Sequence, residues 1–141
     1  MDKGISEEKE VNEIIRNMNR LREPFRSLAL KLHSALKAAG LHLEPFETLR
    51  TMSRQEELVK KKVSRTLKSR HLVGQACDFV VYGKGGWSWG ERDVDFDGQT
   101  EDEKAEYIKM GDIIAEKFPE LEWGGSWKGS WDKAHVQLRA T

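Results

Sequence analysis

Two short segments that lie far apart in the chain carry the residues that most constrain its fold. The first contains His71 and Asp78, and the second contains Asp132 and His135. Two neutral imidazoles and a carboxylate are a common ligand set for catalytic zinc, because three protein ligands leave a fourth tetrahedral position for water. A further acid close by is then available to accept a proton. If these residues form one site, the fold must bring the two segments side by side.

A predicted β-strand over residues 76–82 provides the first half of such a site. This segment is rich in β-branched and aromatic side chains, which are typical of strands. His71 lies too far from Asp78 to share one rigid strand, but Gly74 offers a bend that returns the imidazole over the strand face. His135 begins another predicted strand. If the two strands are neighbours, Asp78 and His135 point toward the same metal ion.

Hydrophobic periodicity elsewhere in the chain predicts helices and further short strands. Helices are expected at residues 6–21, 24–39, 53–63 and 100–118, and extended segments at 41–50, 122–125 and 135–138. No internal repeat or low-complexity linker marks a domain boundary. We therefore expect one domain over residues 1–141, with residues 1–23 as a helical extension at the amino terminus. The predicted fold class is α+β, with a small antiparallel sheet packed against helices.

Local signals set the expected ends of several elements. Pro45 predicts an irregularity in the strand that it interrupts. Ser53 is expected to cap the third helix, and a capping-box pattern beginning at Thr100 precedes the fourth. Between the elements, residues 64–73 and 83–99 are predicted to be loops.

Composition excludes several classes of protein. The 141 residues carry 24 basic and 24 acidic side chains, so the overall balance does not indicate a polyanionic partner. The basic stretch at residues 60–70 lacks interleaved aromatic residues, so we expect no nucleic-acid site there. Cys77 is the only cysteine, which excludes an intramolecular disulfide and suits a reducing compartment; we expect it to be buried. No apolar run spans a membrane, and no secretory signal is evident at the amino terminus.

The residues around the predicted ligands resemble a known family. The pattern is Ser69-x-His71-x-x-Gly74-x-Ala76-x-Asp78, followed far downstream by Asp132-x-x-His135. It is similar to the signature of VanY-type zinc peptidases. These are the D-alanyl-D-alanine carboxypeptidases and L-alanyl-D-glutamate endopeptidases of the lysostaphin/carboxypeptidase/hedgehog fold group. Residues 47–55 resemble the arginine segment of the family, and residues 122–127 resemble its tryptophan-glycine segment. The likeness covers roughly residues 24–138 in the same order.

The resemblance implies a role for each residue of the site. His71, Asp78 and His135 would bind one zinc ion per chain, and Asp132 would be the catalytic base beside the metal. Arg50 matches the family arginine near the reacting carbonyl, where a guanidinium can stabilise the developing oxyanion. The alternative for Arg50 is an exposed position next to a helix.

Four further residues are candidates for binding substrate. Trp123 and Trp127 match family positions, and they either wall the active-site groove or serve only in packing. Ser69 either binds substrate or shapes the loop that carries the first ligand. Gln55 either contacts substrate or lies on a helix surface.

An acidic stretch at residues 91–103 offers a second possible metal site. Asp93, Asp95 and Asp97 copy the opening of an EF-hand calcium loop, but Lys104 stands where that loop needs a bidentate glutamate. The stretch is therefore either a calcium site of another geometry or a solvated acidic loop. Its length is typical of a flap over a cleft.

The resemblance implies a zinc-dependent peptidoglycan hydrolase that acts on the stem peptide. An aspartate at the base position is more typical of the endopeptidase branch, so we expect a phage or prophage endolysin that cuts the L-alanyl-D-glutamate bond. Such a protein is made in the bacterial cytoplasm and acts on the cell wall after release, and we expect a monomer. One alternative is D-alanyl-D-alanine carboxypeptidase or dipeptidase activity. Another is a non-catalytic, zinc-containing module that binds the cell wall.

Overall fold

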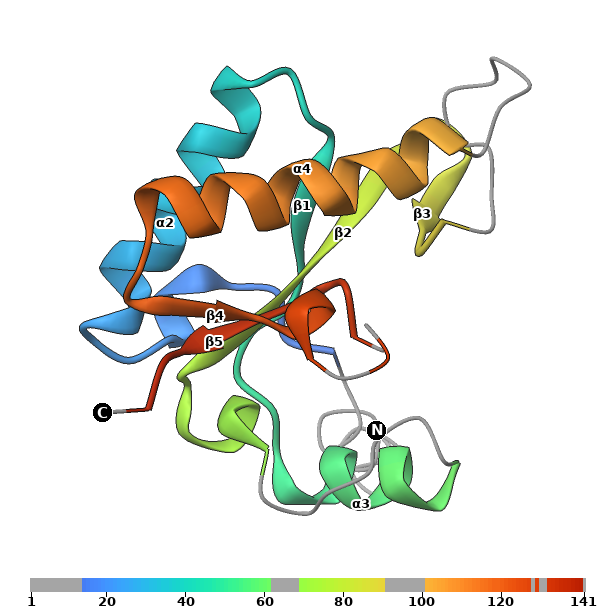
Figure 1. Cartoon of the computed structure of the whole chain (residues 1–141). Helices are drawn as coiled ribbons and strands as arrows, with labels where there is room; N and C mark the ends of the chain where they lie inside the picture. The colour runs from blue at the N-terminus through green and yellow to red at the C-terminus, as the bar shows by residue number, and fades with distance from the viewer. Residues whose placement is uncertain (1–13, 62–68, 91–100, 128, 130–131, 141) are drawn as a thin grey trace.

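The computed structural model describes residues 14–61, 69–90, 101–127, 129 and 132–140 (Figure 1). Within them, the helices are α2 (Phe25–Ala38), α3 (Met52–Lys60) and α4 (Glu101–Lys117). Three short 3-10 turns are η1 (Met18–Arg20), η2 (Arg70–Val73) and η3 (Gly124–Ser126). The strands are β1 (Leu43–Glu47), β2 (Ala76–Gly83), β3 (Gly86–Ser88), β4 (Leu121–Trp123) and β5 (His135–Leu138).

All strands belong to one antiparallel sheet of order β1-β2-β5-β4, with β3 also paired to β2. Strand β5 pairs with the first residues of β2, and β3 pairs with its last residues. Strand β1 is paired with β2 through a bulge between Pro45 and Glu47. The predicted irregularity at Pro45 is therefore confirmed. Strand β2 is long and central, and it pairs directly with β1, β3 and β5.

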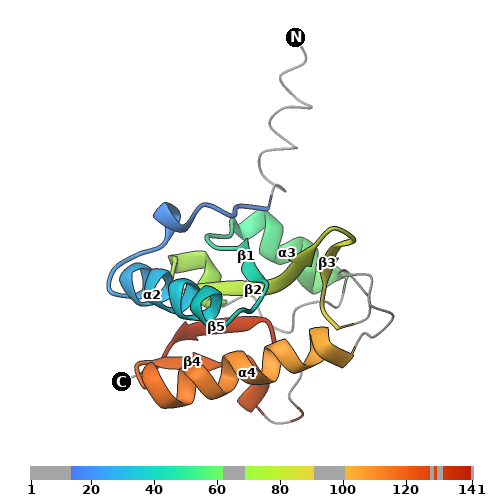
Figure 2. The ribbon, with the colours of Figure 1, turned by 90° about the horizontal axis from the view of Figure 1, so that it is seen from above.

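A single hydrophobic core joins α2 and α4 to the sheet. Apolar residues at helical spacing in α2 and α4 are buried against strand residues, and the largest of these buried side chains are Phe25, Leu32, Leu36, Tyr107, Met110, Leu43, Phe79 and Leu121. Figure 2 shows that α3 and α4 lie on opposite sides of β2 and β5. The helices α2 and α4 therefore form the scaffold of the fold.

Three local predictions differ from the structure. Residues 14–17 have no regular structure and Met18–Arg20 form only a 3-10 turn, so the described part of the predicted helix at 6–21 is not α-helical. Thr51, not Ser53, caps α3, since its side chain accepts a hydrogen bond from the Arg54 amide at 3.1 Å. Strand β3 lies within the predicted loop at 83–99.

Two further stretches differ: Arg70–Val73, within the predicted loop at 64–73, form η2, and Gly124–Ser126, which overlap the predicted extended segment at 122–125, form η3. Other predictions of the fold are confirmed. The α+β class, the strands around Asp78 and His135, and the left-handed bend at Gly74 (φ 69°) all agree with the structure. Thr100 and the acidic residues Asp93, Asp95 and Asp97 lie outside the described residues. Cys77 is fully buried, as expected.

Candidate metal centre and active site

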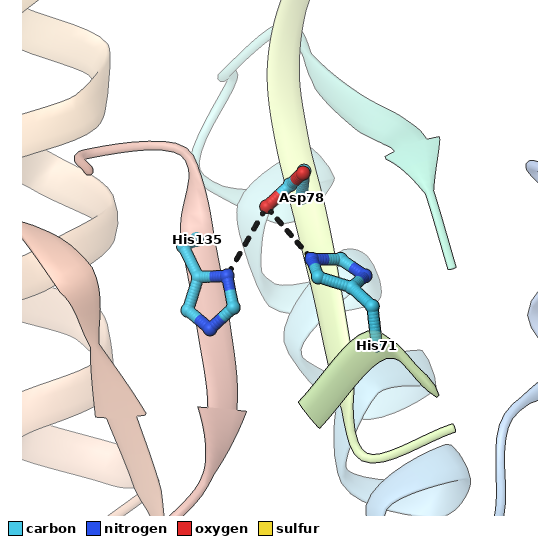
Figure 3. A group of neighbouring side chains, drawn as sticks. All are labelled: His71, Asp78 and His135. Carbon is cyan, nitrogen blue, oxygen red and sulfur yellow. Dashed lines mark hydrogen bonds and ion pairs between the residues drawn. The ribbon is translucent and has the colours of Figure 1, made fainter. Parts of the chain in front are cut away.

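His71, Asp78 and His135 converge on one point from three elements (Figure 3). Nε2 of His71, which comes from η2, lies 3.2 Å from Oδ1 of Asp78 on β2. Nδ1 of His135, the first residue of β5, lies 3.4 Å from the same oxygen. One donor atom from each residue lies within 4.8 Å of the other two. The spacing suits three ligands around a single ion.

The backbone explains why these side chains meet. Asp78 and His135 are directly paired across β2 and β5, so their side chains emerge on the same face of the sheet. Gly74 ends η2 in the left-handed conformation and turns the chain into β2, which places His71 over that face. A side chain at Gly74 would also lie 3.1 Å from the Arg22 amide nitrogen. Glycine suits both the left-handed backbone and the close approach of Arg22 at this position.

Each histidine uses its second ring nitrogen to contact an oxygen. Nδ1 of His71 lies 2.7 Å from the carbonyl oxygen of Thr48. Nε2 of His135 lies 2.9 Å from Oε1 of Gln137. Since these oxygens accept hydrogen bonds, the outer nitrogens carry the hydrogens in the neutral rings. The lone pairs of both inner nitrogens then face Asp78.

This donor set fits a divalent metal ion. Two lone pairs and a carboxylate oxygen repel each other unless a cation lies among them. Two imidazoles and one carboxylate match the known ligand sets of catalytic zinc, with a fourth position left open. Burial would raise the pKa of Asp78, but His71 and His135 hold it well below its usual value.

Asp132 lies beside these three residues. Its Oδ2 atom is 3.8 Å from Nδ1 of His135, and its side chain is partly exposed. Burial, reinforced by the negative charge of Asp78, raises the pKa of Asp132 to about 6. A carboxylate with a raised pKa next to a metal centre is suited to exchanging protons near neutral pH.

The turn that carries Asp132 and His135 is fixed by close backbone contacts. The His135 amide donates to the carbonyl oxygen of Asp132 at 3.1 Å. Gly124 packs directly against this turn, because a Cβ atom there would lie 2.2 Å from the same carbonyl oxygen. The indole Nε1 of Trp123 donates to the carbonyl oxygen of Lys133 at 2.7 Å. These contacts fix the positions of Asp132 and His135 relative to each other.

The two tryptophans predicted to line the groove have different environments. The indole of Trp123 lies against Gly111 of α4 and against Gly125, where a Cβ atom would come within 2.4 Å and 2.2 Å of its ring. Trp123 therefore serves in packing. The ring of Trp127 lies 5.1 Å from that of His135, centroid to centroid. Trp127 therefore lies beside a candidate metal ligand, and its Nε1 donates to Glu122.

Arg50 is buried beside the metal centre, so the exposed alternative is wrong. Its guanidinium donates through Nη1 to Oε1 of Gln55 at 2.7 Å and through Nη2 to Oε1 of Glu47 at 2.9 Å. Nη2 also lies 3.5 Å from Oδ2 of Asp78. The Arg50 amide donates to the carbonyl oxygen of His71 at 3.0 Å. Arg50 thus links three parts of the site.

Glu47 is a member of this network that the sequence analysis missed. It is buried at the bulge of β1, and its second oxygen accepts a hydrogen bond from Nε of Arg54 at 3.1 Å. One carboxylate therefore forms ion pairs with two guanidinium groups, those of Arg50 and Arg54. The available signal was the spacing of the three residues within the arginine segment.

Ser69 and Gln55 both contact neighbouring parts of the site. Oγ of Ser69 accepts a hydrogen bond from the His71 amide at 3.2 Å and so begins η2. Ser69 thereby shapes the ligand loop. Gln55 is fully buried and bonded to Arg50, so its placement on a helix surface is wrong.

Comparison with known proteins decides the family. The model of an M15 peptidase family described as D-alanyl-D-alanine carboxypeptidase matches residues 62–138, which is more than half of the chain. The chain belongs to this M15 peptidase family. The matched residues include all three candidate metal ligands and Asp132. The resemblance inferred from the motifs is therefore confirmed.

Two relatives in this family carry a more specific description. The L-alanyl-D-glutamate peptidase of Listeria phage A118 is 32% identical over 122 residues, which cover 86% of this chain and 39% of that protein. The peptidoglycan L-alanyl-D-glutamate endopeptidase CwlK of Bacillus subtilis is 30% identical over 118 residues, covering 74% of this chain and 67% of that protein. The chain thus spans about two fifths of the phage relative.

A solved structure has a similar fold. The L-Ala D-Glu endopeptidase ChiX of Serratia marcescens matches with a TM-score of 0.60 and 30% identity, over 90% of this chain and 92% of that chain. The agreement confirms the α+β fold class. Among the described residues, no helix is both long and apolar enough to cross a membrane.

Proposed function

We propose that this M15 peptidase is a zinc-dependent peptidoglycan hydrolase that cleaves the L-alanyl-D-glutamate bond of the stem peptide. The observation that carries the proposal is the convergence of His71, Asp78 and His135 with Asp132 beside them. The names of the phage, Bacillus and Serratia relatives support the choice of bond. The phage relative further supports an endolysin role, with action on the bacterial cell wall.

In this proposal, Asp132 moves the proton. A zinc ion held by the three ligands would lower the pKa of a water molecule to about 7 and polarise the scissile carbonyl. Oδ2 of Asp132 accepts the proton of the attacking water and then passes it to the leaving amine nitrogen. Its partly exposed position beside His135 leaves room for both steps. The ring of Trp127 packs against His135, with 5.1 Å between the ring centroids.

Arg50 contributes positive charge to the same site. Its contacts with Glu47 and Gln55 fix the guanidinium, and Nη2 remains close to Asp78. A fixed charge there stabilises negative charge that develops on the carbonyl oxygen, without reorganisation during the reaction. Ser69 and Gln55 support the site by positioning His71 and Arg50.

The Asp132→Asn variant tests the proposal. We expect it to fold and to bind about one zinc ion per chain, because Asp132 is not a ligand, while hydrolysis is lost. The wild-type protein is incubated with purified muropeptides, and the products are identified by mass spectrometry. Products that begin with D-glutamate support the proposal. Release of free alanine alone would identify a carboxypeptidase, and no hydrolysis at all would favour a non-catalytic wall-binding module.

A further inference from the structure

An aromatic cluster outside the metal centre spans β1, β2 and β3. Phe46 makes edge-on contacts with Trp87 and Trp89, at centroid distances of 5.0 Å and 4.9 Å. Tyr82 packs against Trp87 at 4.6 Å. Despite these contacts, Tyr82 is 49% exposed and Trp89 is 51% exposed. We call these four residues the aromatic platform. An exposed apolar patch of this kind is typical of a binding surface.

The aromatic platform lies on the same face of the sheet as the metal centre. Asp78 and Tyr82 are four residues apart on β2, so their side chains point to one face. Tyr82 is directly paired with Trp87 of β3. The bulge in β1 accommodates Phe46 next to Glu47, which contacts the site through Arg50. At about 3.3 Å per residue, the platform begins roughly 13 Å from Asp78 along β2.

The two ends of β2 differ in their exposure. At the start of β2, η2 and Gly74 pack against the backbone of Arg20 and Arg22. Near the end of β2, Tyr82 on β2 and Trp89 just after β3 are each about half exposed. A ligand that extends from the metal centre along β2 therefore reaches the aromatic platform.

Arg16 gives this surface a polar side. Its guanidinium lies over the rings of Phe46 and Trp87, at 4.9 Å and 5.1 Å from their centroids. Arg16 covers one face of these two rings, and the exposed residues beside it are Tyr82 and Trp89. Exposed aromatic rings near a hydrogen-bond donor suit a sugar, because its C–H groups pack on a ring while its hydroxyl and acetamido oxygens accept hydrogen bonds.

We propose that the aromatic platform binds the amino-sugar chain of peptidoglycan. The inference rests on the proposed function, because it takes the scissile bond to lie next to L-alanine. In peptidoglycan, the amino side of that alanine is linked through a lactyl group to an N-acetylated sugar. The L-alanine residue and the lactyl group each extend the chain by about 3.3 Å, and the sugar rings follow them. Together they span the distance from the metal centre to the aromatic platform. The site then recognises glycan and peptide together.

Two substrates that differ only in the sugar test this proposal. One is a disaccharide-tetrapeptide muropeptide, and the other is the same tetrapeptide without its disaccharide. In Trp89→Ala and Tyr82→Thr, we expect kcat/KM for the sugar-bearing substrate to fall by roughly tenfold and that for the free peptide to stay unchanged. Equal losses on both substrates, or no loss on the first, would overturn the proposal. Ile108→Ala is the control, since Ile108 is an equally exposed apolar residue on α4.

A second measurement is independent of hydrolysis. The full chain is titrated with tri-N-acetylchitotriose while the indole N–H signals of the tryptophans are followed by NMR. We expect the Trp87 and Trp89 signals to shift and the Trp123 signal to stay in place, and the shifts to be lost in Tyr82→Thr. Unmoved Trp87 and Trp89 signals would overturn the platform as a sugar site. If the wild type binds this saccharide but cleaves neither substrate, the proposed function fails and the sugar site stands.

Discussion

Nδ1 of His71 donates its hydrogen to the backbone carbonyl oxygen of Thr48, 2.7 Å away. Thr48 is itself held by hydrogen bonds from its amide and hydroxyl to the carbonyl oxygen of Ile15, at 2.7 Å and 3.1 Å. The segment before α2 thus holds Thr48 in place, and Thr48 in turn fixes the tautomer of the candidate ligand His71. Such support orients a metal-binding imidazole and raises its basicity.

Gln137 plays the same part for His135, and its removal is expected to weaken zinc binding. Gln137→Leu removes the oxygen that accepts from Nε2 of His135, so zinc affinity falls by about 10- to 100-fold. Gln137→Glu retains an acceptor at the same position and serves as the matched control. Zinc affinity is measured by competition with a chromogenic chelator. Equal affinity of Gln137→Leu and the wild type would contradict this role.

The protonation of Asp132 is expected to depend on the metal. Burial and the charge of Asp78 raise its pKa to about 6 in the metal-free protein. Since the folded-state pKa lies above the unfolded value of about 3.9, Asp132 favours folding most at low pH, and this contribution is lost as the pH rises through 6. A bound cation lowers the pKa, so the acidic limb of kcat/KM lies below pH 6. Carboxyl ¹³C NMR titrations measure the pKa of Asp132 without and with zinc. Identical midpoints in the two titrations would refute the predicted effect of the metal on this pKa.

Glu47 is expected to be needed for both stability and catalysis. In Glu47→Gln, the buried guanidinium of Arg50 loses its shortest charged contact and Arg54 loses its counter-charge. Breaking a buried ion pair from one side costs about 3–5 kcal/mol, which should appear in the free energy of unfolding. A displaced Arg50 also lowers kcat, because its charge no longer lies at the site. Urea denaturation and kcat measurements test the two effects.

Glu44 provides a matched control on the same strand. Its carboxylate contacts His33 and Lys37 at the surface, with partial exposure of all three side chains. Glu44→Gln is therefore expected to cost about 1 kcal/mol or less and to leave kcat unchanged. If Glu47→Gln proves as mild as Glu44→Gln, the buried network does not position Arg50.

Most of the fold could be predicted because it depends on local patterns. The apolar spacing of α2 and the β-branched run of β2 each specify one type of element and one buried face. The missed features depend on context. Strand β3 is only three residues long and its hairpin turn contains Lys84 and Gly85, which carry little β propensity. Thr51 and Ser53 both have a hydroxyl suited to capping, so the sequence did not distinguish them.

The site was predicted unevenly for a similar reason. The metal ligands combine a distinctive chemistry with ordered motifs, whereas Glu47 is a single acidic residue in an edge strand and such residues are usually exposed. Its burial requires two arginines from a neighbouring segment. The packing role of Trp123 depends on Gly111, which is distant in sequence and leaves the space that the indole fills. Contacts of this kind become visible only in three dimensions.

Gly124 is expected to be as important for activity as a catalytic side chain. A methyl group there would lie 2.2 Å from the carbonyl oxygen of Asp132 and 3.1 Å from Cβ of His135, so Gly124→Ala must displace the turn that carries both residues. A shift of about 1 Å can cost 100-fold in rate, and overpacking costs about 1–3 kcal/mol. We therefore expect kcat to fall by at least about tenfold and zinc affinity to weaken. Gly40→Ala separates this effect from general destabilisation. Gly40 has a φ of 79°, and a Cβ atom added there would have no neighbouring atom within 4 Å. We therefore expect Gly40→Ala to lose stability through backbone strain alone and to keep full activity. Thermal denaturation, zinc titration and kcat are compared for the two variants, and a fully active Gly124→Ala would show that the turn tolerates displacement.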